Sequence, residues 1–300
     1  MSEDNKKGQT SSFTISGKFR DYGKLIKMSL SIMVVFSAVI SYLLAPKVVA
    51  YDWTSILLLF IAGMLVTGSA NAVNQVVERD TDALMKRTAS RPVAAGRMSV
   101  TEGWAFSIIT GVAGVFLLAW FFNGVSAAIA AFSWFLYAFI YTPLKKVNAI
   151  SVIVGAVPGA LPCLIGWAAG DDQLSAGGWI LFAFQFLWQF PHFWAIAWLA
   201  HKDYSAAGFR LLPGEKDPTR YTALQSILYS LLLFPIGFAP YLTGMTGWVS
   251  AIIVTVANLF MLWQSVRLYR EMEAKAARRV MFGSYIYLPV VLLAWLIDKV

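Results

Sequence analysis

Long apolar runs separated by short polar connections dominate the chain. Nine of these runs are long enough, or nearly long enough, to cross about 30 Å of hydrocarbon as helices. They cover residues 25–45, 54–77, 99–121, 125–142, 151–169, 178–200, 221–243, 247–266 and 281–297. The pattern predicts an all-α membrane protein, a bundle of nine transmembrane helices. We expect a single transmembrane domain over residues 21–300, preceded by a disordered polar tail over residues 1–20.

The lysines and arginines are concentrated in alternate connections. All but two of the 24 lie in the N-terminal segment or in connections that would open on one side of a membrane. Only Lys47 and Lys299 fall on the other side. Because short cytoplasmic loops carry an excess of Lys and Arg, the pattern predicts a cytoplasmic N-terminus and a C-terminus on the opposite side.

Composition supports the same class of protein. Hydrophobic residues make up 58% of the chain and charged residues 13%, whereas about a quarter of the residues of a soluble domain are charged. This excludes a soluble globular protein and makes the lipid bilayer a partner. The net charge of +8 follows from the basic connections, so we expect no nucleic-acid partner. The single cysteine, Cys163, cannot form an intrachain disulfide.

Polar residues enter the end of the second apolar run and continue into the basic connection after it. Four of them are spaced by three, four and four residues, which places them on one helical face at about 100° per residue. They are Asn71, Asn74, Glu78 and Asp82. Asp80 points to the opposite face, and four basic residues follow the stripe, namely Lys86, Arg87, Arg91 and Arg97. Carboxylate and amide oxygens suit Mg²⁺ and guanidinium groups bind phosphates, so this stretch predicts a metal–diphosphate site at the membrane surface.

A second polar set follows the sixth run. Gln185, Gln189, His192 and Asp203 share one helical face, which Pro191 can kink. Glutamines inside a membrane are more often interhelical hydrogen-bond partners than ligands. Imidazole is a common ligand of haem iron and of other metals, although two histidines in the chain, His192 and His201, exclude a multi-histidine metal site. Asp203, with Lys202 and Arg210, could form a second diphosphate or metal contact facing the first.

Between these sets the chain reads Tyr141-Thr-Pro-Leu-Lys-Lys and then Gly155-Ala-Val-Pro-Gly-Ala-Leu-Pro. Prolines and glycines within a span either break the helix or allow close packing, and such backbone is tolerated where protein or a cavity covers it. A tight helix crossing and a substrate wall are both compatible with this pattern. The 12 Trp, 12 Tyr and 21 Phe residues could supply rings that line a cavity for a polyprenyl chain or a planar macrocycle.

At these residues the chain resembles the intramembrane prenyltransferases of the UbiA type, and most closely the branch that farnesylates haem. The motifs that carry the resemblance are N-x-x-N-Q-x-x-E-x-x-x-D-x-x-M-x-R-T-x-x-R-P from Asn71, Y-T-P-L-K from Tyr141, G-A-V-P-G-A-L-P from Gly155, W-Q-x-P-H-F from Trp188 and K-D-Y-x-x-A-G-F-R-x-L-P from Lys202. They span most of the chain beyond the tail. The wider family has Asp where this chain has Glu78, and a fuller D-x-x-x-D where it has only Asp203 beside Tyr204.

The resemblance implies transfer of a farnesyl group from farnesyl diphosphate to a vinyl group of haem B, with addition of water, to give haem O and diphosphate. Mg²⁺ would be held through Asn74, Glu78 and Asp82, and haem B would be a substrate rather than a permanent cofactor. The implied catalytic residues are Asn71, Asn74, Glu78, Asp82, Arg87, Arg91 and Asp203. The implied substrate-binding residues are Lys86, Tyr141, Lys145, His192, Lys202 and Arg210, with His192 as the haem contact.

The resemblance also implies a place in haem A biosynthesis for terminal oxidases, with haem A synthase or a terminal oxidase as protein partners. The first residues contain no apolar signal core and no Arg-rich transit pattern, so we expect a bacterial plasma membrane with the active site on its cytoplasmic side. Three other interpretations stay open. They are a related enzyme acting on an aromatic quinone precursor, a membrane transporter, and a haem-binding scaffold without catalysis.

Overall fold

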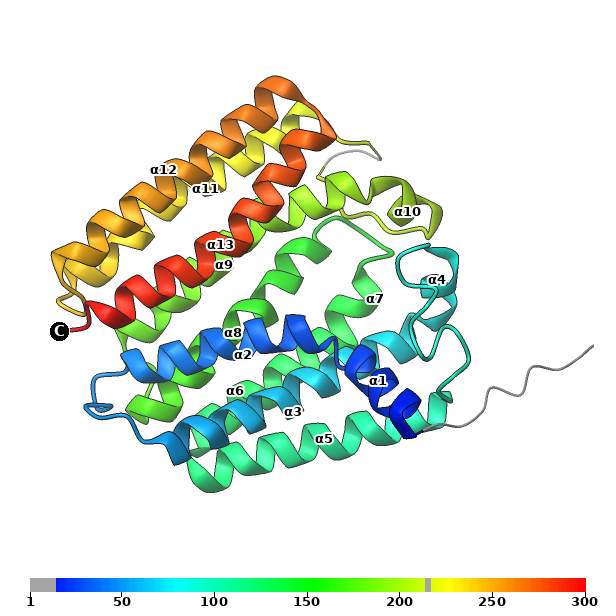
Figure 1. Cartoon of the computed structure of the whole chain (residues 1–300), viewed down its shortest axis with the longest axis horizontal. Coiled ribbons are helices and arrows are strands. Elements are labelled where there is room, and N and C mark those ends of the chain that lie inside the picture. Colours follow the sequence, from blue (N-terminus) through cyan, green and yellow to red (C-terminus); the bar gives the residue numbers. More distant parts are fainter. Residues whose placement is uncertain (1–14, 214–216) are drawn as a thin grey trace, which may run out of the picture.

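The computed structural model describes residues 15–213 and 217–300, and these ranges form helices and loops without a strand (Figure 1). The elements are α1 (Ile15–Leu25), α2 (Met28–Leu44), α3 (Trp53–Val77), α4 (Arg79–Leu84), α5 (Val100–Phe121), α6 (Gly124–Phe135), the π-helix η1 (Leu136–Tyr141), α7 (Thr142–Leu144), α8 (Ser151–Asp171), α9 (Ala176–Leu199), α10 (His201–Ala206), α11 (Arg220–Leu242), α12 (Trp248–Glu271) and α13 (Ala274–Ile297). The predicted all-α membrane architecture is confirmed.

The apolar runs correspond closely to the long helices. Within the described ranges, eight helical spans are long and apolar enough to cross a membrane, the fourth run being covered by α6, η1 and α7 together. The first run is carried by α2, which is joined to α1 at a bend of 52°, and this pair would make a ninth span. The count of nine and the orientation of the two termini therefore stay predictions.

The predicted extent of the N-terminal tail is wrong at its end. Residues 15–20 belong to helix α1, whereas residues 1–14 lie outside the described residues. The polar side chains of α1 have partners in the bundle. Lys18 and Tyr22, four residues apart on α1, both donate to Glu102 at the start of α5, at 2.7 and 2.8 Å. Asp21 accepts from Arg97 at 3.0 Å on the same side. These pairs fix α1 against the bundle.

The helices form two groups that meet along α8 and α9 (Figure 1). One group contains α2, α3, α5, α6 and α8, and the other contains α9, α11, α12 and α13. Helix α2 also contacts α13. The short predicted turn after α5 is confirmed at Asn123, whose side chain caps α6 through Ser126 N and donates to Ala168 O at 2.7 Å.

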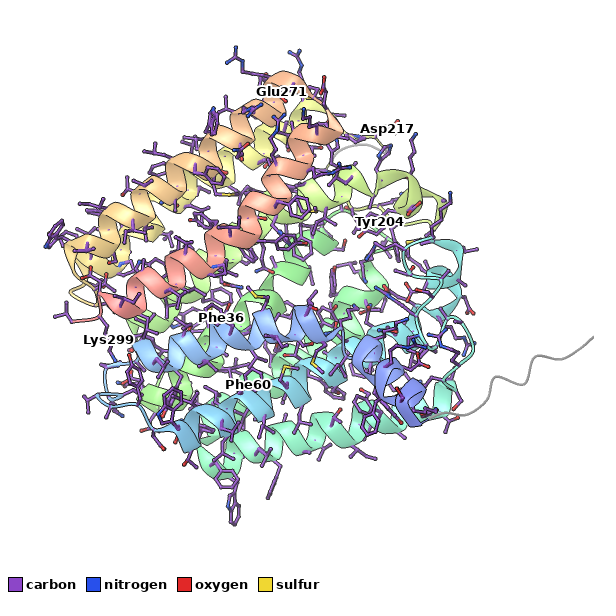
Figure 2. All side chains as sticks on the ribbon, in the orientation of Figure 1. Phe36, Phe60, Tyr204, Asp217, Glu271 and Lys299 are labelled. Atoms are coloured by element: carbon purple, nitrogen blue, oxygen red, sulfur yellow. The ribbon has the colours of Figure 1, made fainter. Side chains whose placement is uncertain are left out.

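The two basic residues that the charge pattern separates from the others lie at one end of the bundle. Lys299 donates to the carbonyl oxygens of Leu43, Ala45 and Val48, each at 2.8 Å. Lys47, in the same loop, donates to Asp171 O at 2.7 Å. These ammonium groups add hydrogen bonds to carbonyls at helix ends and in the connecting loop. Lys299 lies at the opposite end of the bundle from Tyr204 (Figure 2).

Candidate functional site

The polar stripe lies on one continuous helical face. Helix α3 ends at Val77, yet Glu78 N donates to Asn74 O at 3.0 Å and Asp82 N donates to Glu78 O at 2.7 Å, so the helical path continues into α4. All four stripe residues are buried, including Asn71. The side chain of Asp80, by contrast, is 89% exposed. The stripe therefore faces the interior of the bundle, as its spacing predicts.

Each of the three residues predicted to hold a metal is paired with a cation from another segment. Lys27 Nζ donates to Asn74 Oδ1 at 3.0 Å, and Lys145 Nζ lies 2.5 Å from Glu78 Oε1. Arg91 Nη1 lies 2.7 and 2.6 Å from the two Asp82 oxygens. Three basic side chains thus converge on a buried stripe that carries two carboxyl groups.

The Asp82–Arg91 pair is the most deeply enclosed of these contacts. The Asp82 side chain is fully buried and that of Arg91 is 17% exposed. Burial raises the pKa of the Asp82 carboxyl, and the adjacent Arg91 guanidinium opposes that shift. Thr88 donates to Asp82 O at 2.9 Å and so holds the loop that carries Arg91. Removing the guanidinium would leave a carboxylate without a partner in a buried setting, which is unfavourable.

Lys145 joins the stripe to the second polar segment. Its ammonium lies 4.8 Å from the ring centre of Tyr141 and 5.6 Å from that of Phe209, both within range for a cation–π interaction. Its carbonyl oxygen accepts from Arg210 N at 3.1 Å. The Y-T-P-L-K motif and the segment after α10 are therefore adjacent at Glu78.

Lys27 is a site residue that sequence reasoning missed. It lies at the break between α1 and α2 with a φ of 49°, a left-handed conformation that costs a non-glycine residue about 1–2 kcal/mol. Gln75 stabilises the break by donating to the carbonyls of Lys24 and Leu25 at 2.8 and 2.9 Å. Asn71 contributes by donating to Ile26 O at 3.2 Å. In sequence, Lys27 is one of several basic residues in the N-terminal segment, and nothing in the local pattern separates it from them.

The segment after α9, which belongs to the second polar set, also reaches this end of the bundle. Arg87 Nη2 donates to Tyr204 Oη at 3.2 Å, and Met85 packs with Ala207 and Phe209. Helix α10 and the loop after α4 therefore lie together at the same end of the molecule (Figures 1 and 2).

The charged residues of α10 and its exit do not join the stripe directly. Asp203 is half-buried, and its carboxylate forms no ion pair with any residue of ranges 15–213 and 217–300. Lys202 and Lys86 are exposed. Arg210 is also exposed and lines a groove of about 710 Å³ with Tyr204 and His201. The catalytic and substrate-binding roles assigned to all these residues stay predictions.

The two glutamines of α9, Gln185 and Gln189, are both buried. Gln189 donates to Ala156 O on α8 at 3.0 Å, in agreement with a structural role, and Gly159 gives it room, since a Cβ there would collide with the Gln189 amide. The G-A-V-P-G segment is thus a close crossing on one side of α8. Pro158 and Gly159 also line a cavity, and a substrate wall at this segment stays a prediction.

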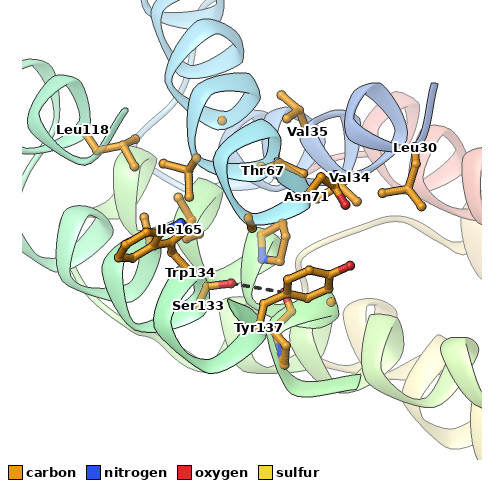
Figure 3. Close-up of a pocket in the computed structure, with 18 of the residues that line it drawn as sticks. Leu30, Val34, Val35, Thr67, Asn71, Leu118, Ser133, Trp134, Tyr137 and Ile165 are labelled. Atoms are coloured by element: carbon orange, nitrogen blue, oxygen red, sulfur yellow. Dashed lines mark hydrogen bonds between the residues drawn. The ribbon is translucent and has the colours of Figure 1, made fainter. Parts of the chain in front are cut away.

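An apolar cavity of about 90 Å³ extends away from the stripe between α2, α3, α5, α6, η1 and α8 (Figure 3). Asn71 and Tyr137 lie on its wall together with apolar side chains such as Val34 and Leu118. Because Pro162 has no N–H, the carbonyl of Pro158 lacks its helical donor, and Ser133 Oγ donates to it at 3.3 Å. A polar end and an apolar cavity are therefore neighbours, the arrangement that a diphosphate with a hydrocarbon tail requires.

The chain is similar to known proteins over most of its length. The UbiA prenyltransferase family matches residues 34–288. The protoheme IX farnesyltransferase of Cytophaga hutchinsonii is 42% identical over 286 residues, which cover 95% of this chain and 100% of that protein. The protoheme IX farnesyltransferase of Flavobacterium johnsoniae is 42% identical over 293 residues, covering 95% of this chain and 96% of that protein.

Among solved structures, that of a digeranylgeranylglyceryl phosphate synthase is similar with a TM-score of 0.78 at 20% identity, covering 94% of this chain and 98% of that one. A UbiA homologue from Archaeoglobus fulgidus, bound to GPP and Mg²⁺, gives a TM-score of 0.65 at 13% identity, covering 91% and 99%. At these identities the structural likeness shows the fold.

Proposed function

Since this chain belongs to the UbiA prenyltransferase family, we propose that it transfers a farnesyl group from farnesyl diphosphate to a vinyl group of haem B. The relatives that match it over nearly their full length are protoheme IX farnesyltransferases, which supports haem as the acceptor. The protein is an integral membrane protein. Its reaction would therefore join two substrates that both partition into a bilayer.

The observation that carries the proposal is the set of three cations on the buried stripe. Lys27, Lys145 and Arg91 each occupy an oxygen of the stripe, and a diphosphate could accept hydrogen bonds from all three. Charge-assisted hydrogen bonds of this kind are the strong ones. The apolar cavity that begins at Asn71 would take part of the isoprenoid tail. At about 90 Å³, it is smaller than an engineered cavity of roughly 150 Å³ that binds one benzene, so it must widen to accept a 15-carbon chain.

The stripe also fits a magnesium ion. It offers two carboxylates and one amide oxygen on consecutive helical turns, and Mg²⁺ prefers one or two carboxylates together with substrate phosphates. Bound there through Asn74, Glu78 and Asp82, the ion would supply charge neutralisation for the departing diphosphate. A UbiA homologue has been solved with a prenyl diphosphate and Mg²⁺, which supports the same pairing here.

The residues of the chain act mainly by positioning and neutralising charge. When the C1–O bond of farnesyl diphosphate breaks, its electron pair leaves with the diphosphate, and Arg91, Lys145 and Lys27 stabilise the charge that develops. The vinyl π electrons then form the new bond to C1. Water adds to the resulting cation and loses a proton, which gives the hydroxyl of haem O. The rings of Tyr141 and Tyr137 near this end exclude bulk water and can stabilise positive charge through their faces.

We place the reaction on the cytoplasmic face of a bacterial plasma membrane, because the basic connections lie on the side of the stripe and short cytoplasmic loops are rich in Lys and Arg. The product would pass to an enzyme of haem A synthesis or to a terminal oxidase. A physical contact with such a protein is part of the proposal.

The test is an acceptor assay with the purified protein in sealed vesicles without an ion gradient. Farnesyl diphosphate and Mg²⁺ are supplied with haem B or with an aromatic quinone precursor, and Glu78→Gln serves as the inactive control. We expect a product with the mass of haem plus farnesyl and hydroxyl groups. Turnover of the quinone precursor alone would show that the acceptor is the quinone precursor and not haem B. Absence of prenyl transfer to either acceptor would refute the enzymatic role and favour a transporter or a haem-binding scaffold.

A further inference from the structure

His192, on α9, faces α13 in a ring of aromatic side chains. Its imidazole stacks on Trp188 with 5.0 Å between ring centres and 16° between planes. Tyr285 approaches it edge-on at 5.0 Å and 70°. Trp188 is itself fixed, because its Nε1 donates to Ser284 O at 3.1 Å. The imidazole plane is therefore defined by packing on both sides.

A hydrogen-bond chain then determines which imidazole nitrogen carries the proton. Ser284 Oγ donates its only hydrogen to Met281 O at 2.6 Å. His192 Nδ1 lies 2.8 Å from the same oxygen, so Ser284 can only accept in that contact. His192 is consequently protonated on Nδ1, and its Nε2 carries the free lone pair.

Nε2 of His192 makes no hydrogen bond to the described residues. Across ranges 15–213 and 217–300, His192 makes no hydrogen bond other than the one to Ser284. His192 is half-buried and Tyr285 is 45% exposed, so both side chains reach the surface of the bundle. A metal-bound histidine usually donates the N–H of its other ring nitrogen to an acceptor, and this hydrogen bond fixes the tautomer.

We propose that Nε2 of His192 is an axial ligand of the iron of the haem substrate, and that Ser284 is the positioning residue that keeps it in the ligating tautomer. This inference rests on the proposed function, since it concerns the acceptor of that reaction. His192 lies two turns before the end of α9, which leads into α10, where Tyr204 accepts from Arg87. A macrocycle held at His192 would therefore lie toward the end of the bundle where the diphosphate is proposed to bind.

The experiment is a titration of the full-length protein in nanodiscs with ferric haem, without farnesyl diphosphate or Mg²⁺, followed by the Soret band. Wild type should give the spectrum of imidazole-ligated haem. His192→Ala should lose that spectrum, and added imidazole should restore it. Ser284→Ala should raise the haem Kd roughly tenfold or more, the effect of removing such a supporting partner, whereas Ser284→Thr keeps the hydroxyl and should bind as wild type does.

His201→Ala is the matched control, because His201 is the only other histidine, and it should leave the spectrum unchanged. An unchanged spectrum in His192→Ala overturns the ligation even where wild type farnesylates haem, and an equal Kd in Ser284→Ala and wild type overturns the positioning role of Ser284. Failure of wild type to bind haem at all refutes the proposed acceptor instead. Imidazole rescue separates loss of the ligand from loss of the fold.

Discussion

Lys27 Nζ donates a hydrogen bond to Asn74 Oδ1 at 3.0 Å. The backbone of Lys27 is in the left-handed conformation, which is unfavourable for an L-residue. Backbone strain of this kind persists where the surrounding structure enforces it, and it is concentrated at functional sites. Here the enforcing residues are Asn71 and Gln75, whose side chains donate to the carbonyl oxygens of the break. The strain and the ammonium position are therefore separable by mutation.

Lys27→Gly and Lys27→Met should separate them. Glycine removes both the left-handed strain and the ammonium, whereas methionine removes the ammonium alone, so the glycine variant should be the more stable of the two by about 1 kcal/mol. Both should bind an unreactive farnesyl diphosphate analogue roughly ten- to a hundredfold more weakly, since a hydrogen bond to a charged group contributes about 1.5–3 kcal/mol. Calorimetric titration and thermal unfolding measure the two effects.

Lys24→Met, an exposed position one turn earlier on α1, is the control for Lys27 and should leave the affinity unchanged. Equal affinity of wild type and Lys27→Met for the analogue would remove Lys27 from the site.

Arg91 should matter for both turnover and stability. Arg91→Ala should lower kcat roughly 100- to 1,000-fold, the usual effect of losing one donor to a developing negative charge. It should also lower the unfolding midpoint, because it leaves the buried Asp82 carboxylate without its partner. Adding Asp82→Asn should recover stability without recovering activity. Arg79→Ala, which breaks an exposed pair with Asp80, should change neither quantity, and a double variant that regains turnover would contradict the assignment.

Metal binding should depend on diphosphate. In the described structure the stripe oxygens are already paired with cations, so a metal alone must compete with Lys145 for Glu78. Diphosphate gives those cations another partner, and it should tighten Mn²⁺ binding by a factor of about 5–150, the usual range of coupling. Electron paramagnetic resonance of free Mn²⁺, with and without inorganic pyrophosphate, measures the factor.

Lys145→Met provides the matched variant for the metal experiment. It frees Glu78, so it should strengthen binding of the metal alone and reduce the coupling. The same coupling in wild type and Lys145→Met would argue against partner exchange at Glu78.

Sequence reasoning succeeded where periodicity governs structure. The spans followed from apolar run length, and the buried face shared by α3 and α4 followed from the spacing of Asn74, Glu78 and Asp82. It failed where a contact joins distant segments through geometry alone. Lys27 meets Asn74 only because the chain breaks at a position without glycine or proline, and Ser284 meets His192 across 92 residues. Neither contact leaves a local pattern in the sequence.

The apolar cavity should set the accepted chain length. Val34 lies on its wall and is half-buried, so Val34→Phe can fill the space without a fully buried clash. We expect transfer from farnesyl diphosphate to fall while transfer from the shorter geranyl diphosphate is retained. Ile32→Phe, on the exposed side of α2, should leave the ratio of the two rates unchanged. A Val34→Phe ratio equal to that of wild type would place the tail elsewhere.

The most direct test of the account is an experimental structure of the protein with Mg²⁺ and an unreactive farnesyl diphosphate analogue. We predict diphosphate density between Lys27, Lys145 and Arg91, with the ion against Glu78 and Asp82. Diphosphate density in the groove lined by Arg210, with those ion pairs intact, would contradict it.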